Sequence, residues 1–281
     1  MSSPQFYFQN AMSEFMYGKS PRYTGFPTAE DMDNADYNLA YEKYKERFAD
    51  AGDFHFYFVG NVDEEKLVSL CETYLASLPG KGSNETYKVT DFRPLTGSHK
   101  KIIEKGEDPK SSVRMTYHGP TEYDEKEAHA LSSLAEVLTI KLIEKLREEE
   151  GGVYGAGANA RISNMPYDWY SFNISFPCGP ENVDKLIAAT LKEVDELIAN
   201  GPTEKDLEKV KKAQILDYKE DLKTNRFWLR QLKNADYLKK DAHNILKFEN
   251  AVNSLTVTDL HNAAKKYLTQ GYITGIHNPE K

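Results

Sequence analysis

Arg147 and Tyr154 are the two side chains of this sequence whose types and spacing best suit chemistry. They stand in the stretch LREEEGGVYGAGA (146–158), one at the end of a predicted helix and the other just inside a predicted strand. A guanidinium and a phenol both donate hydrogen bonds, and preorganised donors stabilise a carbonyl oxygen as it gains negative charge. The pair could therefore hold the oxyanion of a reacting carbonyl group.

A purely structural interpretation of the same two residues is also open. A cation in the last turn of a helix is favourable because it faces the negative end of the helix dipole. An aromatic residue such as Tyr154 is common in a sheet. The spacing alone does not decide between the two interpretations.

Metal chemistry has little support in the sequence. A zinc pair on one helix needs two histidines three or four positions apart, so that both imidazoles reach one ion. No two of the histidines have that spacing, and only a site built from distant histidines stays open. We expect His129 and His261 to be surface or capping residues. The histidines are His55, His99, His118, His129, His243, His261 and His277.

Nucleophile and phosphate motifs are also missing from the sequence. It contains no Gly-x-Ser-x-Gly, and GGVYGAGA (151–158) lacks the Lys-Ser/Thr that follows a phosphate-binding loop. That stretch also runs from helix to strand, the reverse of the nucleotide fingerprints. We expect its glycines to allow a tight helix exit and the close approach of another chain.

The composition is that of a soluble globular protein. With 36 Lys and Arg against 44 Asp and Glu, the net charge is −8, and neither sign forms a long block. Nucleic acid is therefore an unfavourable partner, because phosphate binding needs clustered cations. No run of residues reaches the roughly 18–20 apolar positions of a membrane span. Cys71 and Cys178 have no metal spacing, and we expect both to be core residues.

The first third of the chain predicts a broken series of elements. Residues 1–18 lack a secretory signal and look like part of a helix, and residues 19–35 read as a long connection. A helix over 37–51 precedes a short aromatic strand, FHFYFVG (54–60). Asp63 is the expected N-cap of the next helix, which stops at Pro79-Gly80. A polar linker follows.

The rest of the chain predicts a fuller pattern. Its longest predicted helix covers about 124–149, with one apolar face from Leu131 to Leu146. Thr203 with Asp206 and Thr256 with Asp259 resemble capping boxes that open later helices. The remaining predicted elements are strands near 100–104, 111–117, 153–162 and 169–176, a helix over 181–200, interrupted helices from 203 toward 250, and a final strand, YITGI.

A weak internal repeat indicates two related domains. Residues 39–61 and 260–278 both read as an amphipathic helix, a short turn, an apolar strand and an asparagine. A strand at 54–60 cannot satisfy its backbone without partners. We therefore expect residues 1–95 to be the C-terminal remnant of one domain, and residues 96–281 to be a complete second domain.

Five segments in order resemble the last domain of the pitrilysin/insulinase family of zinc metallopeptidases. The segments are FYFVGNVDEEKLVSLCETYLASLP, KLREEEGGVYGAGA, FNISFPCGPENVDKL, GPTEKDLEKVKKA and LKTNRFWLRQL. The resemblance covers nearly the whole chain. It implies an α+β fold of the LuxS/pitrilysin type, with a mixed, largely antiparallel sheet covered by helices on one face. It implies that the chain comprises the end of the third of four homologous domains and the whole of the fourth.

The resemblance also implies how the chain takes part in hydrolysis. The family's inverted His-x-x-Glu-His zinc motif belongs to its first domain and is absent here, so the chain alone should be inactive and bind no metal. Zinc, the N-terminal catalytic half and a peptide substrate would be the partners of the intact parent. Tyr154 would donate to the scissile carbonyl oxygen, and Arg147 would hold substrate carbonyl or carboxylate groups. Bacterial relatives suggest the periplasm or cell envelope, and some relatives are noncatalytic scaffolds, which is the alternative.

Overall fold

The structure is a computed structural model that describes the whole chain except residues 1–2, 83–85, 91, 150–152, 154 and 281 and the side chains of 147–149. The chain forms two compact units. The sheet unit comprises Met1–Phe26, Val89–Ala213 and Ala251–Lys281, and the helical unit comprises Pro27–Lys88 and Gln214–Asn250. These units are defined by contacts, and the division into a remnant over 1–95 and a domain over 96–281 stays a prediction.

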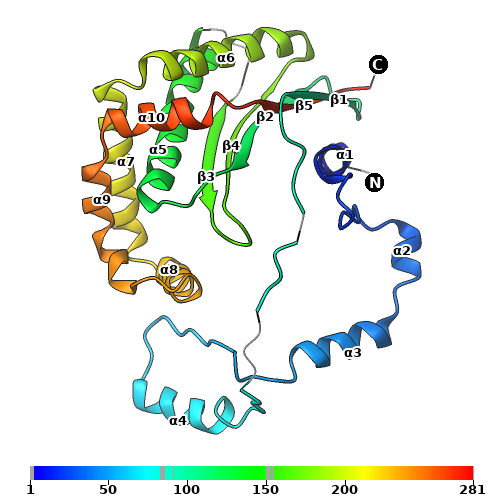
Figure 1. The fold of residues 1–281 in the computed structure, drawn as a ribbon, viewed down its shortest axis with the longest axis vertical. Coiled ribbons are helices and arrows are strands. Elements are labelled where there is room, and N and C mark those ends of the chain that lie inside the picture. Colours follow the sequence, from blue (N-terminus) through cyan, green and yellow to red (C-terminus); the bar gives the residue numbers. More distant parts are fainter. Residues whose placement is uncertain (1–2, 83–85, 91, 150–152, 154, 281) are drawn as a thin grey trace. The chain divides into compact units, whose positions relative to one another are not determined.

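A mixed five-stranded sheet organises the sheet unit (Figure 1). Its spatial order is β1-β5-β2-β4-β3, with β1 parallel to β5 and every other neighbouring pair antiparallel. The predicted α+β class with a largely antiparallel sheet is therefore confirmed. The strands are β1 (His99–Glu104), β2 (Ser111–Pro120), β3 (Gly157–Ser163), β4 (Trp169–Cys178) and β5 (Tyr272–Asn278).

Three helices cover one face of the sheet and build the main core. In β2, Val113, Met115 and Tyr117 point into this core, because alternate residues of a strand face opposite sides. From β4, Phe172 and Ile174 join them with no exposed surface. The covering helices are α5 (Glu125–Leu142), α6 (Val183–Asn200) and α10 (Val257–Tyr267).

The cap that the sequence predicts for α10 is present, and α5 has a cap that the sequence analysis did not predict. Thr256 and Asp259 form the capping box that opens α10, and Asp124 caps α5 by accepting a hydrogen bond from the Glu127 backbone N–H at 2.7 Å. Each cap satisfies backbone donors that the first helical turn leaves unpaired. His261 lies 3.0 Å from the carbonyl oxygen of Ile198 near the end of α6, which confirms its expected capping role.

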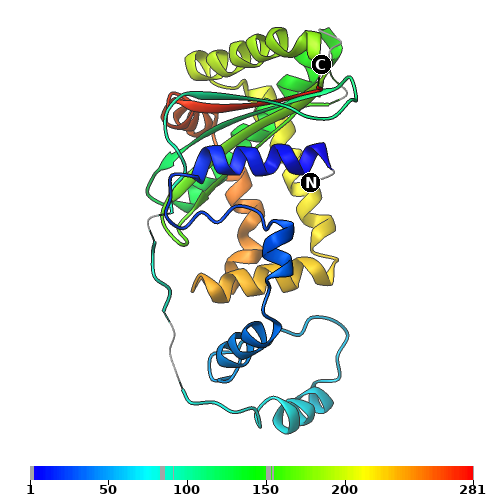
Figure 2. The ribbon, with the colours of Figure 1, turned by 90° about the vertical axis from the view of Figure 1, so that its right-hand side faces the viewer.

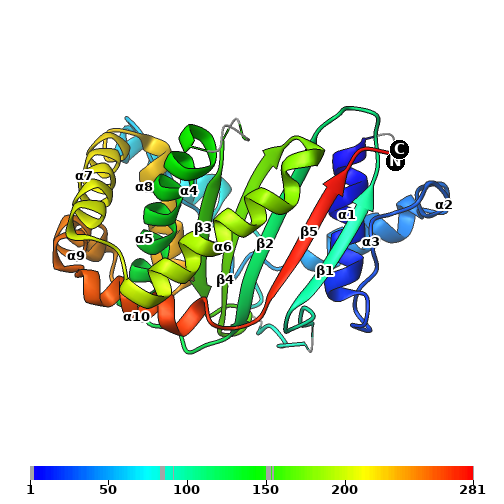
Figure 3. The ribbon, with the colours of Figure 1, turned by 90° about the horizontal axis from the view of Figure 1, so that it is seen from above.

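One helix lies on the opposite face of the sheet. Phe8 and Met12 of α1 (Pro4–Tyr17) pack on Ile103 of β1 and Ile273 of β5. Figures 2 and 3 show α1 across the sheet from α6. Gly275 permits this approach, because a Cβ there would lie 2.8 Å from the Met12 sulfur. We expected helices on one face of the sheet. That expectation is incomplete, because α1 covers part of the second face, at β1 and β5.

The helical unit contains the elements between Pro27 and Lys88 and the segment around α8, from Gln214 to Asn250. Tyr218 and Phe227 pack edge to face within it, and Tyr218 also packs on Phe248 at its C-terminal boundary. Further helices among the described residues are α2 (Ala29–Asp33), α3 (Tyr37–Arg47), α4 (Glu64–Tyr74), the 3-10 helix Pro180–Asn182, α7 (Glu204–Asp221), α8 (Asn225–Tyr237), the 3-10 helix Ala242–Lys247 and α9 (Phe248–Ser254). The short α2 falls inside the stretch 19–35, where we expected only a connection.

The predicted strand at 54–60 is wrong as an element of this chain. Residues 54–59 have no strand assignment, and their backbone forms no ladder with another described segment. The aromatic side chains of this segment and of α3 are largely exposed, with Phe58 at 50% and Tyr37 at 78%. Cys71 of α4, which we expected in the core, is only partly buried. Tyr74 and Leu78, on the same helical stripe, are also exposed.

We predict that Gly271→Ala destabilises the sheet unit by about 1–3 kcal/mol, because overpacking against a fixed neighbour forces the backbone to move. A Cβ at Gly271, just before β5, would lie 2.7 Å from the backbone carbonyl carbon of Gly97, just before β1. Gly157→Ala is the matched control, since nothing lies within 4 Å of its Cβ position. Urea unfolding followed by circular dichroism measures both variants. Equal midpoints for the two variants would contradict the close approach.

Candidate functional site

The two residues singled out by the sequence lie at the edge of what the structure describes. The backbone of Arg147 belongs to a π-helix, Ile143–Glu149, that continues α5. Its side chain and the whole of Tyr154 lie outside the described residues. Their roles at a reacting carbonyl therefore stay predictions. The π-helix itself differs from the predicted α-helix over 124–149, and turns of this kind are frequent at functional sites.

The helix that carries Arg147 is fixed in place up to that residue. Leu142 and Leu146 have no exposed surface, which confirms the predicted apolar face. Two ion pairs join this helix to α7: Lys141 with Asp206 at 3.4 Å and Glu144 with Lys209 at 3.4 Å. Asp206 also accepts hydrogen bonds from the backbone and hydroxyl of Thr203. The predicted capping box thus also helps to hold the end of α5.

The strand that follows Tyr154 is tied to the same helix. The Thr139 hydroxyl accepts a hydrogen bond from the Ala158 backbone N–H at 2.8 Å and lies 2.9 Å from the carbonyl oxygen of Ala135. Ala158 belongs to β3, the edge strand of the sheet, so Thr139 satisfies a backbone donor on its open side. Both ends of the segment 147–157 are therefore held by α5.

The space beside this segment is open. No described atom lies within 4 Å of a Cβ built on Gly155 or Gly157. We expected these glycines to allow the close approach of another chain, and no described part of this chain approaches them closely. That role stays a prediction for an absent partner.

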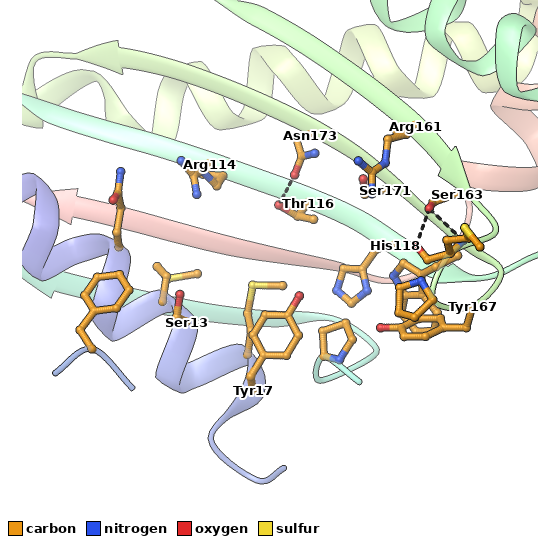
Figure 4. A pocket seen from close by; sticks show the side chains of 18 residues that line it. Ser13, Tyr17, Arg114, Thr116, His118, Arg161, Ser163, Tyr167, Ser171 and Asn173 are labelled. Carbon is orange, nitrogen blue, oxygen red and sulfur yellow. Dashed lines mark hydrogen bonds between the residues drawn. The ribbon is translucent and has the colours of Figure 1, made fainter. Parts of the chain in front are cut away.

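A second candidate site lies on the sheet face beside α1, and the sequence analysis missed it. Figure 4 shows Arg114, Thr116 and His118 of β2 on this face, with Asn173 of β4 and Arg161 of β3 beside them. They line a cavity of about 540 Å³ whose other wall is α1. The available signal was the alternation in β2 and β4, where Arg114, Thr116 and Asn173 each stand between two apolar core residues.

Hydrogen bonds order the centre of this sheet face. The Thr116 hydroxyl donates to the Asn173 side-chain oxygen at 2.9 Å, and the Asn173 amide donates to Asn159 at 3.3 Å. These three side chains form one cross-strand row, since Thr116 is opposite Asn173 and Asn173 is opposite Asn159. The row presents amides and hydroxyls side by side across three strands.

His118 is the most deeply buried polar residue among the described residues that line the cavity. Its side chain packs on the ring of Trp169, with centroids 5.8 Å apart, and only 5% of the residue is exposed. Its Nδ1 has no hydrogen-bond partner among the described residues. Burial lowers the pKa of the His118 imidazole below its ordinary value, because the charged form loses its solvation. Burial therefore favours the neutral form of the His118 ring, which has one unsatisfied nitrogen.

Other chemistry finds little support in the described part of the chain. No group of three or more His, Cys, Asp and Glu side chains there could hold a metal ion. The thiol of Cys178 is buried, as expected, and burial, followed by the nearby Glu181 carboxylate, raises its pKa to about 11. That thiol is a poor nucleophile at neutral pH. Within the same described residues, no helix is both long and apolar enough to cross a membrane.

The buried His118 predicts a pH dependence of stability. Its folded pKa lies below 6.5, so between that value and the folded pKa the unfolded chain binds more protons than the folded one. Stability should therefore fall as the pH decreases below about 6.5. The variant His118→Gln should lose this part of the slope. Urea midpoints measured from pH 7.5 to pH 5 test it, and parallel profiles for the two proteins would contradict the neutral buried ring.

Comparisons with known proteins identify the family. The family model described as the peptidase M16 inactive domain matches residues 39–214, more than half of the chain. The zinc protease PQQL-like of Arabidopsis thaliana is 24% identical over 248 residues, which cover 82% of this chain and 25% of that protein. The chain thus spans about a quarter of the length of this curated relative.

Solved structures agree with that assignment. The periplasmic protease PqqL from Escherichia coli matches 99% of this chain and 31% of its own, with a TM-score of 0.81 and 20% identity. A peptidase M16 inactive domain from Pseudomonas fluorescens matches 98% of this chain and 65% of its own, with a TM-score of 0.76 and 18% identity. At these identities the likeness shows the fold. The chain belongs to the peptidase M16 inactive domain family.

Proposed function

We propose that this chain is the substrate-enclosing, noncatalytic C-terminal part of a zinc endopeptidase that degrades or processes peptides. The match of residues 39–214 to the peptidase M16 inactive domain carries the proposal. Relatives that bear the zinc protease name extend well beyond the region they share with this chain, which leaves room for a catalytic half. The zinc ion and its ligands would then belong to that half, because the described residues here offer no ligand set.

The proposed partner is the N-terminal catalytic half of the same polypeptide. The exposed aromatic strip supports this, namely Tyr37, Tyr41, Tyr44, Phe48, Phe54, Phe56 and Phe58. An exposed apolar patch of this extent usually marks an interaction surface. The segment 54–59 within it has a strand-like sequence and no strand partner among the described residues. Pairing with strands of the upstream domain would cover the rings and satisfy this backbone.

Arg147 and Tyr154 would act at the reacting peptide bond of the substrate. Their segment follows a helix anchored by Leu146 and precedes a strand anchored at Ala158, beside open space at Gly155 and Gly157. Rigid anchors on both sides suit a pair of donors that must be preorganised for an oxyanion. Tyr154 would donate its hydroxyl proton in a hydrogen bond to the carbonyl oxygen as it becomes negative. Arg147 would bind a carbonyl or carboxylate group of the substrate.

The compartment follows from one relative. The Escherichia coli protein of similar fold is described as a periplasmic protease. On that likeness we propose the periplasm or cell envelope for the parent of this chain.

The alternative function is a noncatalytic scaffold or partner subunit of the same fold. The family's description as an inactive domain favours it to the same degree, since this fold does not require a metal site in each copy. The upstream coding sequence separates the two functions. An in-frame His-x-x-Glu-His motif supports the peptidase, and its absence supports the scaffold.

Tyr154→Phe in the full-length parent should lower kcat by about 10²- to 10³-fold, the usual cost of removing one oxyanion donor, with a much smaller change in KM. Cleavage of a fluorogenic peptide measures this effect, with and without a chelator. Tyr237→Phe is the matched control, because Tyr237 is an exposed tyrosine of α8. Unchanged turnover in Tyr154→Phe would refute its role. The 281-residue chain alone should show no cleavage.

A further inference from the structure

The cavity between α1 and the sheet is positively charged in an acidic protein. Arg114 and Arg161 line it, and none of the described lining residues is Asp or Glu. The whole chain has a net charge of −8, so this local excess of cations departs from the average surface. Neither arginine forms an ion pair with a described residue. A cavity of this sign attracts anionic groups.

The unsatisfied nitrogen of His118 is a second and independent indication of a ligand. A buried polar atom without a partner costs about 1–3 kcal/mol, so natural proteins rarely leave one unpaired without a reason. His118 lines the cavity, and only 5% of the residue is exposed. Nδ1 itself has almost no accessible surface, so a bound molecule would have to displace a neighbouring side chain to become its hydrogen-bond partner.

The spacing of the two arginines selects an extended ligand. Arg114 faces Ser175, which faces Gly157, while Arg161 stands four positions further along β3. Four residues along the strands and two strand spacings across them place the two Cα atoms about 16 Å apart. Figure 4 shows the two guanidinium groups at separate points, with the Thr116–Asn173 pair between them. A single small anion would suit one arginine, whereas an extended peptide covers the distance in about five residues.

The opposite wall accepts apolar side chains. Met12, Met16 and Tyr17 of α1 line it, together with Pro94 of the segment that leads into β1. Methionine side chains adapt to different apolar shapes. The cavity volume of about 540 Å³ falls in the range of ligand sites, which is about 300–1,000 Å³. The cavity therefore combines a cationic, hydrogen-bonding floor with an apolar side wall.

We propose that this cavity binds an extended acidic peptide segment, with one carboxylate at Arg114, a second at Arg161, backbone groups along the Thr116–Asn173–Asn159 row and a polar group at His118. Neither Arg147 nor Tyr154 is among the residues that line this site. The claim that the bound peptide is part of the substrate rests on the proposed function. The claim that the cavity binds an acidic peptide is tested on this chain alone. Failure of one proposal therefore leaves the other open to its own experiment.

The test uses a blocked decapeptide with glutamate at its third and eighth positions in a background of serine, alanine and leucine. Its counterpart carries glutamine at both positions. Isothermal titration calorimetry at low salt should show binding of the glutamate peptide and at least fivefold weaker binding of the glutamine peptide. The fluorescence of Trp169, which lines the cavity, should change on binding, and Trp169→Phe should abolish that change.

Arginine variants assign the contacts. Arg114→Gln and Arg161→Gln should each weaken binding about two- to fivefold, because pairs at exposed arginines contribute about 0.2–1 kcal/mol. The double variant should weaken it about five- to twentyfold. Arg226→Gln, which removes the same charge from an exposed position of α8, should leave the affinity unchanged. Melting curves check that the variants fold.

Three results would overturn the proposal. The first is absence of binding at millimolar peptide, and the second is equal affinity for the glutamate and glutamine peptides. The third is binding that the double variant retains or that leaves the Trp169 fluorescence unchanged, since the peptide would then bind elsewhere.

Discussion

The burial of one face of the sheet against α5, α6 and α10 is the constraint on which the rest of the sheet unit depends. Tyr117 of β2 and Phe172 of β4 lie in this core, and each large side chain buried in this way contributes about 1.5–3 kcal/mol. A shift of one residue in the strand register would expose this set and bury its polar neighbours. The register therefore fixes both the core and the cationic face that carries Arg114 and His118.

The same packing holds the residues on either side of the stretch from Arg147 to Tyr154. Leu142 and Leu146 bury the end of the helix, and Thr139 joins that helix to the edge strand at Ala158. Arg147 and Tyr154 come between these two anchors in the sequence. A rigid scaffold that presents functional groups on a short connection is the usual arrangement of binding sites, because the scaffold limits the geometry while the connection can vary.

The sequence predicted well those elements whose signals are local. The apolar face from Leu131 to Leu146 and the caps at Asp63, Thr203 and Thr256 are all present. The strand at 54–60 was wrong because a strand needs a partner, and local pattern cannot show whether one is available. Its counterpart in the repeat, β5, has the same kind of sequence but lies between β1 and β2. Residues 1–18 were expected to be helical, but the position of α1 on the second face and the π-helix depend on tertiary packing, so local periodicity did not reveal them.

The two candidate sites also differ in whether their sequence signals are local. Arg147 and Tyr154 came from residue types, spacing and family resemblance, and their side chains lie outside the described residues. The cavity beside α1 was missed because its residues come from several separate segments, and only the strand register brings Arg114, His118 and Arg161 to one face. His118 in particular resembled any other isolated histidine until its burial and its unpaired nitrogen were visible.

Photo-cross-linking from position 154 tests the central claim most directly. The full-length parent would carry a benzophenone amino acid in place of Tyr154, and it would be treated with a chelator so that a labelled peptide binds without being cleaved. The account predicts a cross-link between position 154 and the peptide that excess unlabelled peptide suppresses. A cross-link only to the protein's own chain, unaffected by the peptide, would contradict the placement of this segment at the substrate.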